Sequence, residues 1–182
     1  MTSTATAPTD QALQPTIHRG LAGVVVDYTT ISMVNQETNS LTYRGYPVQE
    51  LAASCSFEEV AYLIWHGELP NATQLSEFTR QERDRRDLGR NLRGLLLKLP
   101  DDCHPMDVLR TAVSCLGADD PTEDDATPER NLAKSIDLLA KLPTVVALDH
   151  RRRRGLDPIL PDPDLGYTEN FFQMCFGGGS LS

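Results

Sequence analysis

The amino-acid sequence predicts a mainly α-helical fold with a small antiparallel β element near the N-terminus. From residue 56 onward, apolar residues recur three and four positions apart, which is the period of amphipathic helices. β-Prone residues separated by polar breaks are confined to residues 20–43. A chain of 182 residues is long enough for one domain with a hydrophobic core, and neither an internal repeat nor a second domain is visible.

The first part of the chain combines a leader with short strands. Residues 1–16 are rich in Thr, Ala and Pro and have neither a basic nor an apolar region, so we expect a flexible leader rather than a secretory signal. The expected strands are Gly20–Asp27, Ile31–Asn35 and Leu41–Tyr43. A turn then leads to a short helix over 47–54, with proline in its first turn.

The next helix has the clearest start and stop signals. Ser56 and Glu59 have the spacing of a capping box. Gly67 is placed to end the helix, and Pro70 prevents it from restarting. The expected apolar face, at helical spacing, consists of Phe57, Val60, Ala61, Ile64 and Trp65. We interpret Trp65 as a core residue, with Phe57 and Ile64, rather than as part of a ligand site.

Two helices of opposite character follow. Charged residues dominate from Thr73 to about Asp87, where Leu75 and Phe78 are the clear apolar anchors, so we expect this helix to be largely exposed. Its basic residues are interpreted as a solvated face interleaved with acidic ones. The set is Arg80, Arg83, Arg86, Arg90 and Arg93, with Glu82, Asp84 and Asp87. The second helix carries an apolar face of Leu88, Leu92, Leu95, Leu96 and Leu99.

Prolines mark the starts of two later helices. Pro105 opens a helix that Gly117 ends, and an acidic loop over 118–126 follows. The apolar stripe expected on this helix is Met106, Leu109, Val113 and Leu116. Pro128 opens a long helix, and Pro143 either ends or kinks it. Its apolar residues are Leu132, Ile136, Leu139, Leu142, Val145, Val146 and Leu148.

The last expected helix follows a proline-rich loop. Gly155 is the expected C-cap of the long helix, and residues 156–166 form the loop. Thr168 caps a helix over Glu169–Phe176. The apolar residues of this helix are Phe171, Phe172, Met174 and Cys175.

Charge and cysteine content limit the classes of partner. A net charge of -9 and a pI of about 4.8 disfavour nucleic acid and anionic membrane surfaces. No apolar run approaches the roughly 18 residues that a membrane span needs. The four cysteines have no C-x-x-C spacing, which favours reduced thiols and a cytoplasmic location. They are Cys55, Cys103, Cys115 and Cys175.

The histidines do not form a metal-binding pattern. His104 beside Cys103 offers two ligands where a structural zinc site needs four, so we expect His104 to serve at a helix start. His18, His66 and His150 have no cysteine or carboxylate at ligand spacing and are expected at the surface or at helix ends.

Two further motifs have the composition of phosphate-binding segments. The run Arg151–Arg154 is a candidate, but its alternative is a set of cations placed favourably at a helix C-terminus, and we favour that alternative. Gly177-Gly-Gly is not expected to be a phosphate loop, because no strand precedes it and no Lys-Ser/Thr follows.

Several segments, in order, resemble the N-terminal part of the citrate synthase family, and most closely the actinobacterial 2-methylcitrate synthases. They are Gly20-Leu-Ala-Gly-Val, Tyr43-Arg-Gly-Tyr, Phe57 to Pro70, His104-Pro-Met-Asp-Val-Leu-Arg-Thr, Leu142-Pro-Thr-Val-Val-Ala, Arg151-Arg-Arg-Arg-Gly-Leu and Asn170-Phe-Phe-Gln-Met. The resemblance covers about residues 18–177. It implies that residues 17–177 form the N-terminal part of the large domain of the all-α citrate synthase fold, followed by a tail over 178–182 that is foreign to the family.

The resemblance also implies a chemistry. The family condenses acetyl-CoA or propionyl-CoA with oxaloacetate, using a carboxylate base, histidine hydrogen-bond donors and arginines that hold the dianion. Its motifs include His-x-Asp-His-Glu, His-Gly-Gly-Ala-Asn and Gly-His-Arg-x-Tyr, and none of these occurs here. We therefore assign no catalytic, cofactor-binding or metal-binding residue, expect no cofactor bound by this chain, and expect it to be inactive alone.

Two classes of function remain open. The chain is either a truncated portion of the enzyme, through a frameshift, a premature stop, a split gene or a deliberately shortened product, or a non-catalytic binding module. As a module it would pair with a C-terminal half or a full-length paralogue; a pseudogene product is a further alternative. The family is a homodimer, and most of the helices that form the dimer are expected to be missing. Phe171, Phe172, Met174 and Phe176 are the residues whose covering helices would be absent.

Overall fold

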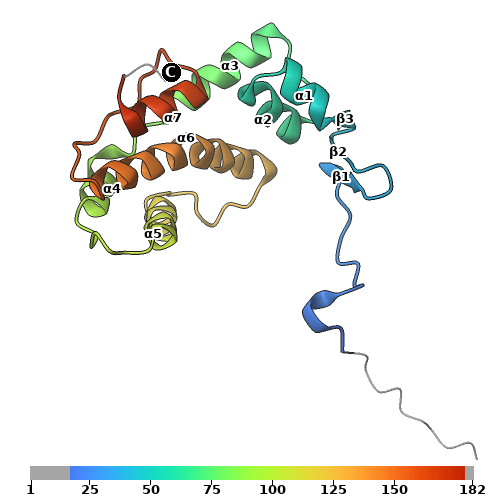
Figure 1. The fold of residues 1–182 in the computed structure, drawn as a ribbon, viewed down its shortest axis with the longest axis horizontal. Coiled ribbons are helices and arrows are strands. Elements are labelled where there is room, and N and C mark those ends of the chain that lie inside the picture. The colour runs from blue at the N-terminus through green and yellow to red at the C-terminus, as the bar shows by residue number, and fades with distance from the viewer. Residues whose placement is uncertain (1–16, 179–182) are drawn as a thin grey trace, which may run out of the picture. The chain divides into compact units, whose positions relative to one another are not determined.

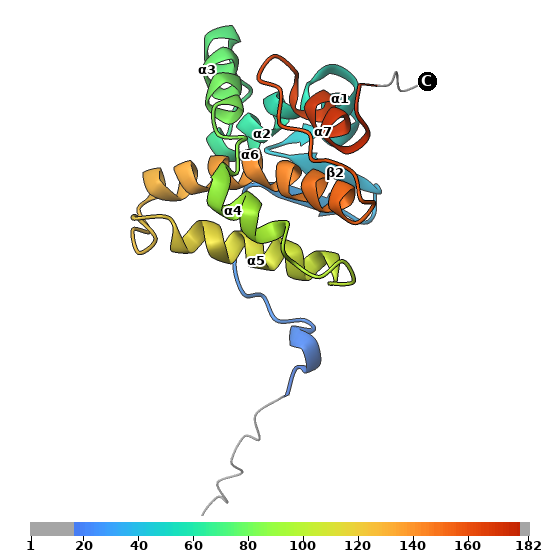
Figure 2. The ribbon, with the colours of Figure 1, turned by 90° about the vertical axis from the view of Figure 1, so that its left-hand side faces the viewer.

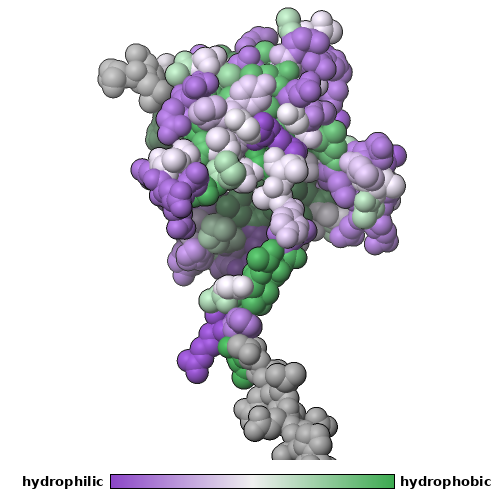
Figure 3. Space-filling model, turned by 90° about the vertical axis from the view of Figure 1, so that its right-hand side faces the viewer, coloured by the Kyte–Doolittle hydropathy of each residue, from purple (hydrophilic) through white to green (hydrophobic). Residues whose placement is uncertain are grey.

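The computed structural model describes residues 17–178, so the predicted leader and most of the predicted foreign tail lie outside it. The chain divides into two compact units, residues 1–30 and 31–182. Among the described residues of the first unit, the one regular element is a 3₁₀ turn, Arg19–Leu21. The segment that follows this turn is mostly apolar (Figure 3).

The predicted strand Gly20–Asp27 is wrong. Gly20, Leu21 and Gly23 have φ angles of 62°, 61° and 75°, which lie in the left-handed region. A strand needs extended backbone, so three left-handed residues within four positions prevent one there. Valine-rich composition alone therefore misled the prediction for this segment.

The small antiparallel sheet is confirmed, but its third strand is Tyr46–Pro47 instead of the predicted Gly20–Asp27. β1 (Ser32–Asn35), β2 (Ser40–Tyr43) and β3 (Tyr46–Pro47) lie in the order β1-β2-β3, with Val34 opposite Leu41. Arg44 and Gly45, both at positive φ, form the two-residue connection between β2 and β3. Positive φ at both central residues suits the twist of a tight hairpin.

Seven α-helices follow within the described residues. They are α1 (Val48–Ser54), α2 (Phe57–His66), α3 (Ala72–Arg83), α4 (Gly89–Leu96), α5 (Pro105–Ala118), α6 (Pro128–Arg152) and α7 (Tyr167–Phe176). The long helix α6 is central: it packs against α3, α5 and α7. Figures 1 and 2 show α7 on one side of α6, with α4 and α5 on another. No described helix combines the length and apolar character needed to cross a membrane.

The helix starts follow the expected capping chemistry. The Glu59 N–H donates to Ser56 Oγ at 3.2 Å, and the Ser56 N–H donates to Glu59 Oε2 at 2.6 Å, so the predicted capping box of α2 is confirmed. Gly67, at φ 90°, ends that helix as predicted. A second box, between Asn71 and Gln74, starts α3. This box was not predicted, because the usual capping-box pattern begins with Ser or Thr and here Asn takes that place.

Two predicted helix faces are wrong in detail. On α2, Leu63 is the fully buried residue, whereas Phe57 is 45% exposed. On α5, the buried residues are Val108 and Ala112, and Met106 is 57% exposed. Both helices are apolar on several sides, so the period of 3.6 residues identifies the helix without choosing its buried side. The leucine face of α4 is confirmed except at Leu95, which is exposed.

Helix α7 begins two residues earlier than predicted. Its N-cap is Gly166, and Thr168 lies within the first turn. The N–H of Tyr167 donates to Glu58 Oε1 on α2 at 3.0 Å. A carboxylate from a distant helix therefore accepts the hydrogen bond that a local cap would accept. Its negative charge is stabilised by the positive end of the α7 dipole.

Pro143 lies inside α6, and the helix continues through it to Arg152. Proline has no N–H, so the carbonyl of Leu139, four residues earlier, lacks its usual helical donor. The hydroxyl of Tyr167 donates to this carbonyl at 3.0 Å. A side chain of α7 thus supplies the hydrogen bond that the proline removes from α6.

Replacing Tyr167 with phenylalanine is expected to destabilise the protein by about 1 kcal/mol, because the carbonyl of Leu139 then has no donor. In a Pro143→Ala background the restored N–H can donate to that carbonyl, so Tyr167→Phe should cost less there. Urea unfolding of the four variants in this double-mutant cycle measures the difference. Equal costs in both backgrounds would show that the hydroxyl does not substitute for the missing N–H.

The same residue gives a test by pH. Burial, followed by the charge of Glu82, raises the pKa of Tyr167 to about 12 from an ordinary value of 10.0. The neutral hydroxyl is favoured in the folded state, so its contribution is complete below pH 10 and is lost as the pH rises toward 12. Between these pH values the wild-type protein should lose more stability than Tyr167→Phe.

Candidate functional site

The arginine run Arg151–Arg154 closes the C-terminal end of α6. The Gly155 N–H donates to the Arg152 carbonyl and the Leu156 N–H to the Arg151 carbonyl, both at 3.0 Å. This pattern, with Gly155 at φ 65°, is a Schellman motif and confirms Gly155 as the predicted stop.

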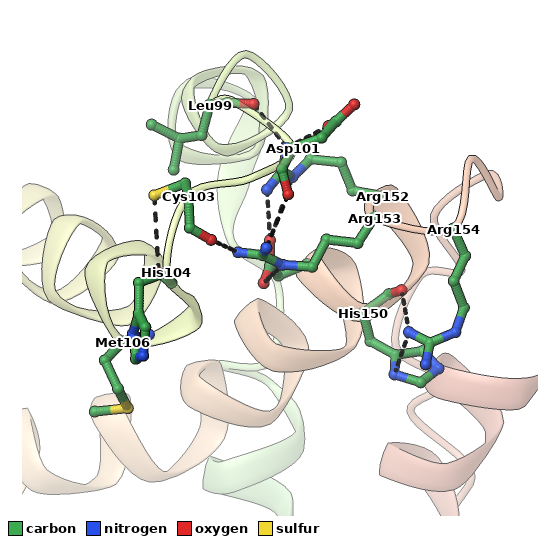
Figure 4. Close-up of polar contacts among 10 residues, drawn as sticks. Leu99, Asp101, Cys103, His104, Met106, His150, Arg152, Arg153 and Arg154 are labelled. Atoms are coloured by element: carbon green, nitrogen blue, oxygen red, sulfur yellow. Dashed lines mark hydrogen bonds and ion pairs between the residues drawn. The ribbon is translucent and has the colours of Figure 1, made fainter.

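Two of the four arginines hold a neighbouring turn. Arg152 Nη1 donates to the Leu99 carbonyl at 2.7 Å and contacts Asp101 Oδ1 at 2.8 Å (Figure 4). Arg153 donates to the carbonyls of Asp101 and Cys103. The chain between α4 and α5 is therefore fixed to the end of α6.

One carboxylate serves both of these arginines. Asp149 Oδ1 accepts from Arg152 Nη2 and Asp149 Oδ2 accepts from Arg153 Nε, both at 2.7 Å. The side chains of Arg152 and Asp149 are only 6% and 10% exposed. Burial with several specific acceptors indicates a structural network, in which these cations are already neutralised.

The two outer arginines are also engaged. Arg151 donates to the carbonyls of Asp157 and Cys175, which links α6 to the following loop and to α7. Arg154 contacts His150 Nδ1 at 3.1 Å and its carbonyl at 3.0 Å. The run thus completes a helix C-terminus, as the favoured interpretation held, and its contacts do not single out a phosphate site.

His104 serves at a helix start, as predicted. Its Nδ1 accepts from the Met106 N–H at 3.2 Å, at the beginning of α5. The adjacent Cys103 thiol contacts the His104 carbonyl rather than the imidazole (Figure 4). Within residues 17–178, three His, Cys, Asp or Glu side chains do not come together anywhere as possible metal ligands.

The other histidines lie against aromatic rings or in the N-terminal turn. His66 stacks on Tyr62 with ring centroids 4.0 Å apart, and burial lowers its pKa. His150 meets the edge of Phe176 at 5.2 Å. Burial, together with the charges of Arg154 and Arg151, lowers the pKa of His150. His18 contacts the carbonyl of Ala22 at 3.1 Å. These contacts explain the histidines as structural residues.

The predicted solvated face, which runs from α3 into α4, is wrong at two positions. Arg86 is 2% exposed and Glu82 is fully buried. Their side chains pair in a two-pronged geometry, with Nε–Oε1 at 2.9 Å and Nη2–Oε2 at 2.7 Å. Arg86 Nη1 also donates to the carbonyls of Asp162 and Leu165, both at 2.9 Å. Because the partners lie 76 and 79 residues away, no local pattern could distinguish this arginine from its exposed neighbours.

The described residues also present an apolar surface, which we call the α7 outer face: Phe172 and Phe176 of α7, with Val146 of α6. These side chains are 37%, 58% and 39% exposed. The rings of Phe172 and Phe176 stack with centroids 6.1 Å apart. Phe172 and Phe176 are exposed, as the prediction of uncovered residues on this helix held, but the prediction is wrong at Met174, which is fully buried against Ala147 of α6.

A groove adjoins the α7 outer face. It has a volume of about 350 Å³ and lies between Phe57 on α2, Pro143 on α6, and Tyr167 and Phe171 on α7. Phe57 and Tyr167 stack in parallel there, with centroids 4.3 Å apart. Its lining is almost entirely apolar, so it suits hydrophobic side chains better than a dianionic acid.

Comparison with known proteins places these features in a family. The model of the family described as "Citrate synthase, C-terminal domain" matches residues 20–181. The chain is 64% identical over 163 residues to a citrate synthase of Mycolicibacterium smegmatis. The matched region covers 90% of this chain and 43% of that protein. It is 60% identical over 176 residues to a 2-methylcitrate synthase of Mycobacterium tuberculosis, covering 97% and 44%.

Solved structures agree in fold. The crystal structure of citrate synthase from Pyrobaculum aerophilum matches with a TM-score of 0.83 and 33% identity, covering 97% of this chain and 47% of that one. The citrate synthase from Thermotoga maritima matches with a TM-score of 0.79 and 34% identity, covering 91% and 43%. The chain thus spans less than half the length of these relatives. The match across residues 20–181 shows that the chain belongs to the citrate synthase family.

Proposed function

We propose that this chain is the helical scaffold portion of a 2-methylcitrate or citrate synthase, an enzyme that condenses an acyl-CoA with oxaloacetate. The observation that carries the proposal is identity of 60–64% to relatives that bear these two names. Relatives named 2-methylcitrate synthase also occur in Corynebacterium glutamicum at 52% identity, which favours propionyl-CoA as the acyl donor.

The reaction needs groups that this chain does not offer. A base must remove a proton from the carbon next to the thioester, and hydrogen-bond donors must stabilise the enolate oxygen. The family motifs expected to supply them are absent from the sequence. The buried arginines Arg86 and Arg152 are committed to Glu82, Asp149 and backbone carbonyls, so they are poor candidates for binding a dicarboxylate.

The chain alone is expected to show no condensing activity. Purified protein would be given propionyl-CoA or acetyl-CoA with oxaloacetate, and the release of free thiol would be followed. The Mycolicibacterium smegmatis citrate synthase serves as the positive control in the same assay. Turnover by the 182-residue chain above the rate without enzyme would contradict the assignment of a scaffold role.

A second candidate function is a non-catalytic binding module. The specific observation in its favour is the α7 outer face, where two phenylalanine rings are partly exposed beside an apolar groove. Contiguous apolar surface of this kind marks interaction sites on soluble proteins. The two candidates are compatible if the partner is the remainder of a synthase.

A further inference from the structure

The connection between α5 and α6, which lie side by side (Figure 2), is strongly acidic. We call residues 119–127 the acidic loop; it carries five carboxylates between Asp119 and Asp125. Like charges this close together repel one another, which opposes a compact conformation. The loop is nevertheless folded into turns, since the N–H groups of Glu123 and Asp125 donate to carbonyls within it at 3.1 and 3.0 Å. Cations from neighbouring elements favour such a fold.

The cation that makes most contacts with the acidic loop is Lys134, in the second turn of α6. Its Nζ donates to the Asp125 carbonyl at 2.8 Å and to the Glu123 carbonyl at 2.9 Å. It also lies 4.0 Å from Asp120 Oδ2. Three acceptors from the loop thus converge on one ammonium group, which has three N–H donors. Hydrogen bonds to a charged donor are stronger than those to a neutral one.

A second cation contributes less. Arg130 Nε lies 3.8 Å from Asp125 Oδ2, and the Arg130 side chain is 55% exposed. The Lys134 side chain is only 29% exposed, so solvent screens its charge less. Lys134 is therefore the residue on which the closed conformation of the loop depends most.

The acidic loop covers part of a pocket between α5 and α6. This pocket has a volume of about 180 Å³, and Asp120 and Glu123 of the loop line it. The Glu123 side chain lies against the end of α5, because its Oε1 would be 3.4 Å from a Cβ added at Gly117. The apolar side chains that line the pocket are Val113, Leu116 and Leu138. Movement of the loop would expose these apolar side chains.

We propose that the acidic loop is a lid over this pocket and that the Lys134 ammonium is the latch that holds the lid closed. Loss of this charge opens the lid, because the carbonyls of Glu123 and Asp125 then lose their charged donor while the carboxylates of the loop still repel one another. The inference is independent of the proposed function, since it involves neither the condensation reaction nor its substrates.

Hydrogen–deuterium exchange of the whole chain tests the latch. Lys134→Met keeps an apolar stem and removes the charge. Exchange in residues 119–127 should therefore accelerate at least about tenfold, as expected when two charge-assisted hydrogen bonds are lost. Lys134→Arg keeps the charge and the donors, so its exchange should fall between those of the wild type and Lys134→Met.

Lys141→Met is the matched control. Lys141 lies on the same helix, lines the same pocket and is similarly exposed, at 20% against 29% for Lys134. Its partner, however, is Asp137 of α6 rather than the acidic loop. Exchange in residues 119–127 should therefore stay as in the wild type. Circular dichroism and the urea midpoint show whether each variant keeps the fold.

Opening of the pocket is measured separately through a thiol placed in its apolar wall. In a Leu138→Cys background, a maleimide should label position 138 faster when Lys134→Met is also present. Peptide mass spectrometry follows the labelling, and the four native cysteines serve as internal references.

Faster exchange confined to the acidic loop, with faster labelling at position 138, supports both the latch and the lid. An unchanged loop in folded Lys134→Met, or equal acceleration in Lys134→Met and Lys141→Met, would overturn the latch. Acceleration that extends equally through α5 and α6 would do the same, because Lys134 would then stabilise the whole helix pair. Unchanged labelling at position 138 beside a loosened loop would overturn the lid.

Discussion

Replacing Arg86 with alanine is expected to lower the free energy of unfolding by about 3–5 kcal/mol, the range for breaking a buried ion pair on one side. The variant leaves the Glu82 carboxylate fully buried without its cation. It also leaves the carbonyls of Asp162 and Leu165 without a donor. The loop before α7 should loosen as a result. Urea unfolding followed by circular dichroism measures the change.

Matched variants show whether burial is the cause. Arg80→Ala removes an arginine that pairs with two carboxylates, Glu77 and Asp84, but its side chain is 60% exposed, so the loss should be far smaller. Arg86→Lys keeps the charge and loses the two-pronged geometry, so it should fall between the two. The double variant Glu82→Leu/Arg86→Met should recover part of the loss, because no charge is then left buried. Equal losses for Arg86→Ala and Arg80→Ala would refute the argument.

The second large effect is expected at Asp149. Asp149→Ala should cost about 3 kcal/mol, because a largely buried carboxylate that pairs with two arginines is removed. Arg152 keeps Asp101 and the Leu99 carbonyl, so the loss should stay below that for Arg86→Ala. Asp149→Asn keeps an acceptor without the charge and should cost less than alanine.

A local measurement tests the role assigned to this network. Hydrogen exchange in residues 99–104 should accelerate in Asp149→Ala, because Arg152 and Arg153 then hold that turn less firmly. Asp107→Ala is the control, since its pair with Arg110 is exposed at 49% and 78%. If exchange in this turn stays unchanged while global stability falls, Asp149 stabilises the end of α6 without fixing the turn.

Local signals in the sequence predicted the elements well. The Ser56 capping box, Gly67, Pro105, Pro128 and Gly155 all marked real helix boundaries, because caps and stops depend on backbone groups within four residues. The family was also predictable, since its segments are recognisable in order without knowledge of the packing.

The errors share a physical origin in distant contacts. Arg86 and Glu82 were expected in solvent because their neighbours are charged, and the acceptors that bury Arg86 lie beyond residue 160. The start of α7 depends on Glu58, and the passage of α6 through Pro143 is accompanied by a hydrogen bond from Tyr167. Hydrophobic patterns and residue propensities depend on short stretches of sequence. They therefore cannot predict contacts with residues far away in the chain.

The hydrogen bond between Glu58 and Tyr167 joins residues 109 positions apart and therefore bears on the order of folding. Bringing together such distant segments costs conformational entropy before the contact compensates for it, and non-local contacts slow folding. During synthesis α2 emerges long before α7, so the Glu58 carboxylate has no Tyr167 N–H to accept from until α7 has been made. Helix α7 can therefore complete its contacts with α2 and α6 only after both of those helices have formed.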